Sequence, residues 1–456
     1  MDKEFNINPV DVPAIHTPYR VIKTALPVPG SVEMLESLRR HEPKSMSGQP
    51  PIIWDRAEGF SVYDPYGNKW IDFSSGVLVA NAGHAAPRVR EAVAAAAAKG
   101  TLYSYCFPNA ARAQLVERLA SLAPDPLNRV FLLTTGSEAV ENAIKVARMY
   151  GRTQDENKYA IVSYERGFHG RTLGSQMAGG IPELKEWVGG RVEGFYQVPF
   201  PDGFRTEDTT FDSFEASLAG QGVEPANVAA VIMETYQGGG ASFAPVPYIE
   251  KLRAWCTKHG VLLVFDEVQA GFGRTGTFWG FEHYGVTPDL ICCGKGIGSS
   301  LPISATIGPD YVMDLAEPGS MTSTHAAHAL CCAAAVANVD TILDEAMVAN
   351  SKVLGDHLHE RLNALMAKHP EVIGAVHGKG LMAGVHFVKS GTKEPDSDLA
   401  FRVTEQCMYR GVMLFAPVGF GSATIKICPP LMIDRFALDE GLDAFADAVS
   451  ASVCGS

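Results

Sequence analysis

One lysine lies where the chain could present a reactive amine. Lys295 follows the apolar run at 289–293 and has a glycine on each side, Gly294 and Gly296. Because glycine has no Cβ, such a turn lets the backbone pass close to a ligand. A lysine amine that is shielded from water there becomes nucleophilic and can bind a carbonyl carbon as a Schiff base. Loop lysines are usually solvated, so a reactive role for Lys295 depends on its neighbours.

A carboxylate occupies a comparable position earlier in the chain. Asp266 comes directly after the five apolar residues 261–265, which predict a buried strand. The carboxyl ends of parallel strands are where α/β proteins bind their ligands. Asp266 is therefore a candidate ligand-binding acid, although position alone also allows a helix N-cap or a buried structural carboxylate.

Two further loops could hold an anion and a flat ring. Gly136 and Ser137 lie between a predicted strand and a predicted helix, where backbone N–H groups and a hydroxyl can bind a phosphate. Phe168 and His169 lie between two glycines in RGFHGRT, and an aromatic ring there could stack on a planar ligand. Each signal is weak by itself, because Gly-Ser also caps helices and a phenylalanine also packs in cores.

Together the four features fit one cofactor. They supply a phosphate cup, a stacking face, a carboxylate and an amine, all at the ends of predicted strands. Pyridoxal 5'-phosphate carries a phosphate, a pyridine ring, a ring nitrogen that pairs with an acid, and an aldehyde that reacts with lysine. The sequence therefore predicts a pyridoxal-phosphate enzyme.

Two nucleotide-binding motifs are matched only in part. The segment 271–276, GFGRTG, fits the dinucleotide pattern GxGxxG, but it begins five residues after Asp266 and no apolar helix follows it. A P-loop is excluded, because Gly296 follows Lys295 where Ser or Thr is needed and Asp289 stands where the first glycine is needed. A nicotinamide dehydrogenase or a P-loop enzyme is thus disfavoured.

The elements that must position these residues alternate in type. From about residue 128, short apolar runs alternate with helical patterns, most clearly in the strand–helix–strand unit at 228–265. This order predicts an α/β domain with a mostly parallel sheet. Residues 326–368 predict one or two long helices, and an α+β pattern follows them.

The same patterns predict a division into domains. Residues 1–76 are expected to form an N-terminal arm and strands that join the smaller domain. Residues 77–335 are expected to form a large cofactor-binding domain, and residues 336–456 a C-terminal small α+β domain.

Composition narrows the class of protein. The 456 residues are 46% apolar and 20% charged, which is typical of a globular protein. The net charge of −13 argues against a broad nucleic-acid surface, which needs clustered positive charge. The nine cysteines include no CxxC pair, so reduced thiols and a cytoplasmic location are expected. No signal-peptide pattern and no run of 18 apolar residues occurs, so no membrane association is expected.

The motifs as a set resemble those of class III aminotransferases, which are pyridoxal-phosphate enzymes of fold type I that include 4-aminobutyrate and other ω-aminotransferases. The matching segments are SSGVLVANAGHAAP, TTGSEAVENAIKVAR, GFHGRT, LLVFDEVQAGFGRTG, DLICCGKGIG and TSTH. The resemblance implies a transaminase that moves an amino group from an amino acid or amine to a 2-oxo acid.

The resemblance also implies roles for residues around the cofactor ring. Lys295 resembles the lysine that forms the internal aldimine and then moves the Cα proton while pyridoxamine phosphate forms. Asp266 resembles the acid that pairs with the pyridine nitrogen, and Gln269 resembles the residue near the ring hydroxyl. Phe168 resembles the aromatic side chain stacked on the ring, with His169 beside it.

Two further sites follow from the resemblance. Gly136 and Ser137 resemble the phosphate cup. Thr324 is similar to the threonine that reaches the phosphate of a neighbouring subunit. The active unit is therefore expected to be a homodimer, or a dimer of dimers, with active sites shared between subunits.

The substrate residues depart from the family pattern. Lys426, before Pro-Pro-Leu, stands where many relatives carry the arginine that binds the oxo-acid carboxylate, and a lysine offers only a point charge. Gly239 stands where many carry a glutamate. Both departures argue against a standard 4-aminobutyrate or ornithine enzyme with 2-oxoglutarate and leave acceptors such as pyruvate open. Lys426 and Val77 are the candidate substrate residues, with a solvated strand lysine as the alternative for Lys426.

Other activities remain open from the sequence. An amino-acid racemase or epimerase, or a decarboxylating relative, would share Lys295 and Asp266, because the cofactor chemistry begins in the same way. A non-catalytic protein that keeps the fold is a further alternative.

Overall fold

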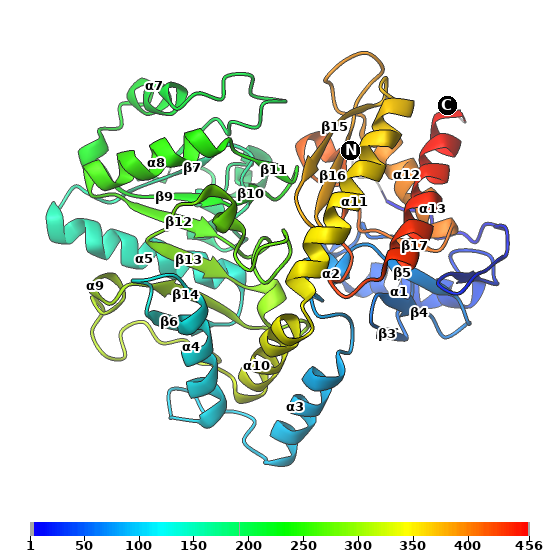
Figure 1. The fold of residues 1–456 in the computed structure, drawn as a ribbon, viewed down its shortest axis with the longest axis horizontal. Helices are drawn as coiled ribbons and strands as arrows, with labels where there is room; N and C mark the ends of the chain where they lie inside the picture. Colours follow the sequence, from blue (N-terminus) through cyan, green and yellow to red (C-terminus); the bar gives the residue numbers. More distant parts are fainter. Residues whose placement is uncertain (1–3, 191, 455–456) are drawn as a thin grey trace. The chain divides into compact units, whose positions relative to one another are not determined.

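The computed structural model describes residues 4–190 and 192–454, which form two compact units. One unit contains the chain up to Ala86 and again from Asn350 onward, and the other is Pro87–Ala349. Figure 1 shows the first unit at the two ends of the colour scale and the second in its middle. The cofactor-binding and small-domain roles expected for the two parts stay predictions.

The unit Pro87–Ala349 is built on a seven-stranded sheet with the order β6-β14-β13-β12-β9-β7-β8. Five neighbouring strands, β13 to β8 in this order, are parallel, and β14 runs antiparallel to both of its neighbours. This arrangement confirms the predicted α/β class with a mostly parallel sheet. The strands are β6 (Arg129–Leu133), β7 (Ala160–Tyr164), β8 (Phe195–Val198), β9 (Val228–Glu234), β12 (Leu262–Asp266), β13 (Leu290–Cys293) and β14 (Ser304–Gly308), with a separate hairpin of β10 (Tyr236–Gln237) and β11 (Ser242–Phe243).

The central strands are buried along their whole length. All seven residues of β9 and all five of β12 are buried, and both strands are nearly continuous apolar runs. Such runs are typical of parallel strands that helices cover on both faces. The polar exceptions are the last residues, Glu234 and Asp266, which therefore lie where the strands leave the core.

Helices of this unit begin and end at recognisable signals. Helix α5 (Gly136–Gln154) begins with a capping box, in which Thr135 and Glu138 each accept the backbone N–H of the other. Helix α8 (Val246–His259) ends at Gly260, whose φ of 62° is the left-handed conformation that glycine adopts without strain. The other helices are α3 (Pro87–Ala98), α4 (Ala110–Leu122), α6 (Leu173–Ala178), α7 (Asp212–Gly220), α9 (Asp310–Met313) and α10 (Ala329–Asp344).

Strands β8 and β14 were not predicted from the sequence. Strand β14 carries Ser304 and Thr306 in its interior, which breaks the apolar pattern. Their hydroxyl groups donate to the backbone oxygens of Thr135 and Ala139, at 2.7 and 2.9 Å. Buried hydroxyls are tolerated when they are hydrogen-bonded, so the neighbouring α5 makes this strand possible.

The other unit contains two further sheets. In the first, the order is β1-β2-β5-β4-β3, and β17 adds to β5 in parallel, so N-terminal and C-terminal segments share one sheet. The second is the antiparallel sheet β15-β16-β18. The strands are β1 (Ile15–His16), β2 (Val21–Ile22), β3 (Arg56–Glu58), β4 (Ser61–Tyr63), β5 (Lys69–Asp72), β15 (Ile373–Gly378), β16 (Ala383–Phe387), β17 (Val412–Met413) and β18 (Thr424–Ile427).

The long helices expected over residues 326–368 are confirmed as α10, in the unit Pro87–Ala349, and α11 (Met347–Lys368). The helices of the unit described here are α1 (Val32–His41), α2 (Ser75–Leu78), α11, which belongs to it from Asn350, α12 (Ser397–Tyr409) and α13 (Arg435–Cys454). Over the described part of the chain, none of the helices has both the length and the hydrophobicity needed to cross a bilayer.

Candidate active site

Asp266 is the last residue of β12, with β9 on one side and β13 on the other. Its register partners are Glu234 and Cys292. The carboxylate is 5% exposed. Its Oδ1 accepts the backbone N–H of Val268 at 3.0 Å, and its Oδ2 lies 2.8 Å from Nδ1 of His169. A buried carboxylate needs such partners, and Asp266 is thereby held in one orientation.

His169 reaches Asp266 from the loop that follows β7. The ring is buried, and its Nε2 has no hydrogen-bond partner among the described residues. Burial alone lowers the pKa of His169, but the hydrogen bond and charge of Asp266, together with the charge of Glu234, raise this pKa above its ordinary value. These two acids therefore favour the protonated, positively charged form of the ring beside Asp266.

Phe168 lies next to this ion pair. Its side chain is half-buried, and its backbone N–H donates to Oε2 of Glu234 at 3.0 Å. The guanidinium carbon of Arg171 lies 5.5 Å from the centre of the Phe168 ring, within cation–π range. The loop thus presents an aromatic ring with an exposed positive charge against it.

The start of α5 is joined to the same loop. Oγ of Ser137 accepts the backbone N–H of Arg171 at 3.1 Å. Gly170 has a φ of 136°, and a Cβ at this position would lie 2.4 Å from Oγ of Ser137, so only glycine fits. The first turn of α5 leaves backbone N–H groups unpaired by the helix, which is the arrangement that binds phosphate groups.

At Gly136, the start of α5 lies close to the backbone that follows β12 and β13. A Cβ at Gly294 would lie 3.6 Å from Cα of Gly136, and a Cβ at Gly136 would lie 2.9 Å from Val268. The segments after β6, β12 and β13 therefore meet at one edge of the sheet, as the sequence predicted from their strand-end positions.

Lys295 begins the short turn after β13. It is half-buried and has a φ of 44°, a left-handed conformation that is uncommon for a residue with a side chain. Nδ2 of the buried Asn338, on α10, donates to the backbone oxygens of Gly296 and Ile297 at 2.7 and 2.9 Å. Asn338 therefore fixes the turn that carries Lys295.

Gln269 lies beside the hairpin after β9. Its backbone oxygen accepts the hydroxyl of Tyr236 at 3.2 Å, and a Cβ at Gly238 would lie 2.7 Å from its Nε2. Thr324 is exposed in the segment before α10. That segment contacts an exposed loop: Tyr105 and Thr322 form a hydroxyl–hydroxyl hydrogen bond of 2.7 Å, and the Tyr103 and His325 ring centres are 5.6 Å apart.

The two candidate substrate residues belong to the other compact unit. Lys426, on β18, is 2% exposed, and its Nζ lies 6.0 Å from the centre of the Phe415 ring. Val77 is 45% exposed and has a φ of 65°. A β-branched residue rarely adopts this conformation, so its neighbours must hold the backbone in place.

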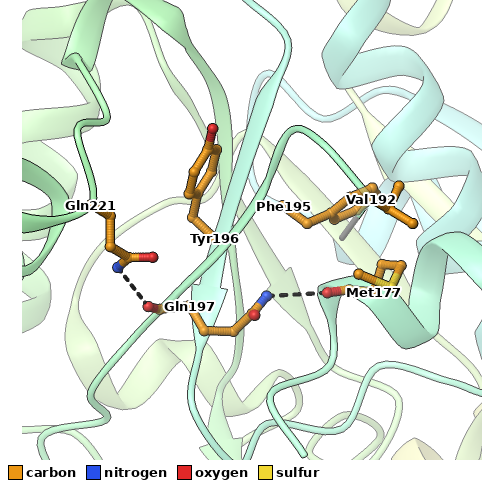
Figure 2. A pocket seen from close by; sticks show the side chains of 6 residues that line it. All are labelled: Met177, Val192, Phe195, Tyr196, Gln197 and Gln221. Atoms are coloured by element: carbon orange, nitrogen blue, oxygen red, sulfur yellow. Dashed lines mark hydrogen bonds between the residues drawn. The ribbon is translucent and has the colours of Figure 1, made fainter. Parts of the chain in front are cut away.

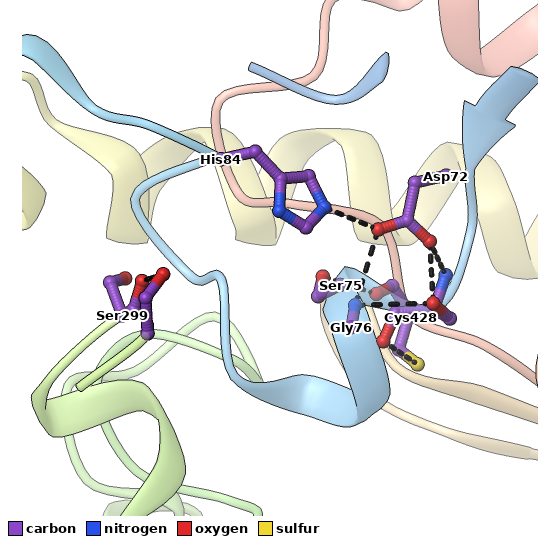
Figure 3. A network of polar contacts seen from close by, with 8 residues as sticks. Asp72, Ser75, Gly76, His84, Ser299 and Cys428 are labelled. Carbon is purple, nitrogen blue, oxygen red and sulfur yellow. Dashed lines mark hydrogen bonds and ion pairs between the residues drawn. The ribbon is translucent and has the colours of Figure 1, made fainter. Parts of the chain in front are cut away.

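A polar network around Asp72 supplies that constraint (Figure 3). Oδ1 of Asp72 accepts the backbone N–H and the hydroxyl of Ser74, both at 2.6 Å. Its Oδ2 accepts the N–H of Gly76 at 3.2 Å and lies 2.6 Å from Nε2 of His84. The hydroxyl of Ser75 donates to the backbone oxygen of Cys428 at 2.6 Å.

A separate hollow lies by β8. It measures about 350 Å³ and is lined by Met177, Val192, Phe195, Tyr196, Gln197 and Gln221, none of which was predicted as a site residue (Figure 2). The side-chain amide of Gln197 donates to the backbone oxygen of Met177. The backbone oxygen of Gln197 accepts a hydrogen bond from the side-chain amide of Gln221. Among the described residues, none of the six that line the hollow is charged, so the strand-end cluster is the better candidate for chemistry.

The sequence as a whole decides the family. The sequence pattern described as aminotransferase class-III matches residues 44–449. This chain belongs to the class III aminotransferases.

Individual relatives and solved structures support the same family. The 4-aminobutyrate aminotransferase of Mycobacterium leprae is 34% identical over 93% of this chain and 96% of its own. The 5-aminovalerate aminotransferase of Pseudomonas putida is 34% identical over 88% of this chain and 94% of its own. A thermostable (S)-enantioselective ω-transaminase from Thermomicrobium roseum has a TM-score of 0.82 and 29% identity, covering 92% and 95% of the two chains.

This class III aminotransferase is therefore an enzyme of fold type I that transfers amino groups, as predicted. The relatives give no support to the racemase, decarboxylase or non-catalytic alternatives. The family depends on pyridoxal phosphate.

The structure adds residues that the sequence interpretation missed. Glu234 ends an apolar run at the edge of the sheet, as Asp266 does, so the same strand-end rule would have found it. Arg171 and Asn338 gave no comparable signal, because their roles depend on contacts with distant segments.

Proposed function

We propose that this aminotransferase binds pyridoxal 5'-phosphate at the edge of the sheet formed by the ends of β7, β9, β12 and β13, with Lys295 as its catalytic lysine. The observation that carries the proposal is that Asp266 ends one strand and Lys295 follows the end of its parallel neighbour. Asp266 pairs in register with Cys292, and Lys295 follows three residues later. A carboxylate and an amine thereby reach the same edge.

The chemistry of the residues fits this cofactor. Ser137 and the backbone N–H groups of the first turn of α5 suit a phosphate, and the half-exposed ring of Phe168 suits a pyridine face. Asp266, held by His169, suits a protonated ring nitrogen, and Gln269 is the proposed partner of the ring hydroxyl. Bound pyridoxal phosphate would supply an aldehyde for amines and a ring that withdraws electrons from the bond being broken.

The residues of the chain then hold charges and move protons. Asp266 provides a fixed negative charge, and His169 keeps it oriented. Lys295 Nζ, once free, is the proposed general base and acid that carries a proton from and to the substrate carbon. The turn held by Asn338 sets where that amine can reach.

Two cations are candidates for binding the acid group of a 2-oxo acid. Lys426 is the candidate from the sequence. Arg171 is the candidate from the structure, because its guanidinium lies over the ring of Phe168 and is exposed. We propose that the donor is an amino acid or amine and the acceptor a 2-oxo acid such as pyruvate, with Val77 contacting the substrate. The names of the relatives add 4-aminobutyrate and 5-aminovalerate as donors to be tested.

The proposed active unit is a homodimer, or a dimer of dimers, in which Thr324 reaches the partner's phosphate site. An apolar loop near the Thr324 segment supports this. Leu102, Tyr103 and Phe107 are 50, 48 and 73% exposed, so three large apolar side chains of one loop lie at the surface. Burial against a second copy would remove this surface from water.

The remaining assignments concern the domains and the compartment. We infer that the cofactor-binding domain is the unit Pro87–Ala349 and that the other unit is the small domain. The proposed compartment is the cytoplasm, which the nine free cysteines support.

A two-stage absorbance experiment tests the proposal. Purified protein loaded with pyridoxal phosphate is mixed with L-alanine, 4-aminobutyrate, 5-aminovalerate and simple amines, and loss of the visible band of the bound cofactor is followed. Pyruvate or 2-oxoglutarate is then added, and return of the band identifies the acceptor. A protein that holds the cofactor but shows no loss of the band with any amine would contradict amino transfer by this site.

A further inference from the structure

Two buried carboxylates lie side by side at the edge of the sheet. Glu234 ends β9 and Asp266 ends β12, and the two residues are register partners on parallel strands. Glu234 is 7% exposed and Asp266 5%. Two neighbouring anions in the protein interior repel each other, so the site needs a shared cation or a proton.

His169 is a basic side chain next to this pair of acids: it bonds to Asp266, and the charge of Glu234 also acts on it. Strand β9 lies between β12 and β7 in the sheet, and the loop after β7 carries His169 to Asp266 across the end of β9, where Glu234 stands. A Cβ at Gly167 would lie 3.5 Å from Nε2 of His169 and 3.8 Å from Oε2 of Glu234. One nitrogen of the imidazole thus meets Asp266, while Nε2 has no hydrogen-bond partner among the described residues and Glu234 acts on the ring through its charge.

Glu234 also binds the backbone of two loops. Its Oε2 accepts the N–H of Phe168 and its Oε1 accepts the N–H of Gly238, each at 3.0 Å. Gly238 in turn lies against Gln269, where a Cβ would come within 2.7 Å of Nε2. One carboxylate therefore joins the loop of the proposed stacking ring to the hairpin beside Gln269.

We propose that Glu234 is a positioning residue of the aminotransferase: it fixes the backbone of Phe168 and places a second negative charge near His169, which strengthens the contact of that ring with Asp266. The proposal rests on the proposed function, because it presumes that Asp266 and Phe168 serve the cofactor. Glu234 acts through these residues and does not touch the cofactor.

The surroundings of Glu234 act on its charge in both directions. Burial raises the pKa of Glu234 to about 7, with the charge of Asp266 acting in the same direction, while His169 and the N–H groups of Phe168 and Gly238 oppose the rise. The pKa of His169 is in turn raised by Asp266 and Glu234 against the effect of burial. Glu267, the next residue in the chain after Asp266, is a further buried acid whose pKa the charge of Asp266 also raises.

The variants separate charge from packing. Glu234→Gln keeps the size and one acceptor oxygen but removes the negative charge. Glu267→Gln is the matched control, because Glu267 is equally buried and close to Asp266 but binds Thr235 and the N–H groups of Gly280 and Phe281. Glu234→Asp keeps the charge on a shorter side chain.

The readout is the titration of His169 by NMR of histidine-labelled protein, in the apoprotein and with pyridoxal phosphate bound. Its signal is assigned by its loss in His169→Gln. We expect Glu234→Gln to lower the pKa of His169 by about one unit, because one of its two anions is gone, and Glu267→Gln to leave it within about 0.3 unit. The dissociation constant of the cofactor, measured by fluorescence, should rise about tenfold in Glu234→Gln only.

Two results would overturn the proposal. One is a His169 titration in Glu234→Gln that matches the wild type, and the other is an equal shift in Glu267→Gln. If Glu234→Gln does not fold, Glu234→Asp decides: it should retain the raised pKa of His169, and loss of the raised pKa there would show that the charge of Glu234 is not responsible. Failure of the wild type to bind pyridoxal phosphate would instead overturn the proposed function, because the His169 titration is measurable in the apoprotein.

Discussion

Nδ1 of His169 lies 2.8 Å from Oδ2 of Asp266, and both side chains are buried. The pair joins the loop after β7 to the end of β12, two strands away in the sheet. Burial removes water from both groups, so each needs the hydrogen bond to the other to offset the loss of hydration. The same contact therefore contributes to the stability of the protein and holds the carboxylate that is proposed to bind the cofactor.

Replacing the histidine should therefore destabilise the protein in a pH-dependent way. In His169→Gln, Asp266 loses its cation, and removal of one partner of a buried pair costs about 3–5 kcal/mol. The folded-state pKa of His169 is raised above its ordinary value of 6.5, so its stabilising contribution is complete below pH 6.5 and falls as the pH rises through the higher folded value. Urea denaturation should give a larger difference from wild type at pH 6 than at pH 9, and equal differences would contradict a protonated His169.

The amine of Lys295 should be essential. Lys295→Ala is expected to abolish both half-reactions and the visible band of the bound cofactor, because no other amine is proposed to react or to move the substrate proton. The control is Lys251→Ala, which removes an exposed lysine from α8 and should leave both signals unchanged. The proposed role is wrong if Lys295→Ala keeps either activity or the band.

Glu267 should make the protein less stable as the pH rises. Burial raises the pKa of Glu267 from 4.5 to about 7. A carboxyl group whose folded-state pKa is raised binds its proton more tightly in the folded state, so folding stability falls as the pH rises from about 4.5 to about 7. The difference corresponds to up to roughly 3 kcal/mol.

In Glu267→Gln this titration is absent, so the decrease in unfolding free energy between pH 5 and pH 8 should be smaller than in the wild type. Denaturation of the apoprotein at both pH values measures the effect. An unchanged decrease would mean that Glu267 ionises in the folded protein at its ordinary pKa.

The turn of Lys295 should depend on Asn338. In Asn338→Ala, the buried backbone oxygens of Gly296 and Ile297 lose their donor, at a cost of about 1–3 kcal/mol. Because Lys295 itself has a left-handed backbone, a looser turn should also slow the half-reaction about tenfold or more. Thr341→Ala is the control, since its hydroxyl bonds to Ala337 within the same helix. A rate loss of the same size in both variants would exclude a specific effect on the turn.

Steady-state kinetics should separate the two candidate cations. If Arg171 binds the acid group, Arg171→Gln should raise the KM for the 2-oxo acid about tenfold or more and leave the reaction of simple amines unchanged. If Lys426 binds it, the same effect should follow Lys426→Met, which also keeps the buried volume. The variant without this effect excludes its residue as the carboxylate site.

Much of the architecture followed from local patterns. Strands β9 and β12, helix α8 between them and helix α5 after Gly136 and Ser137 were predicted from local patterns and are confirmed. The strand-end positions of Asp266 and Lys295 followed from the same kind of pattern. Strands β8 and β14 were not predicted. Strand β14 is stabilised by hydroxyl groups that donate to backbone oxygens at the start of α5, which lies 167–169 residues away in the chain.

The sequence by itself thus determined the family, the elements and the types of group available for chemistry, because these depend on residue types at short spacing. Only the tertiary structure decided which groups meet. His169 and Asp266 are 97 residues apart in the chain, and Phe168 and Glu234 are 66 apart. Their contacts exist because the sheet places β9 between β7 and β12, an order that depends on the packing of whole elements and leaves no short-range pattern in the sequence.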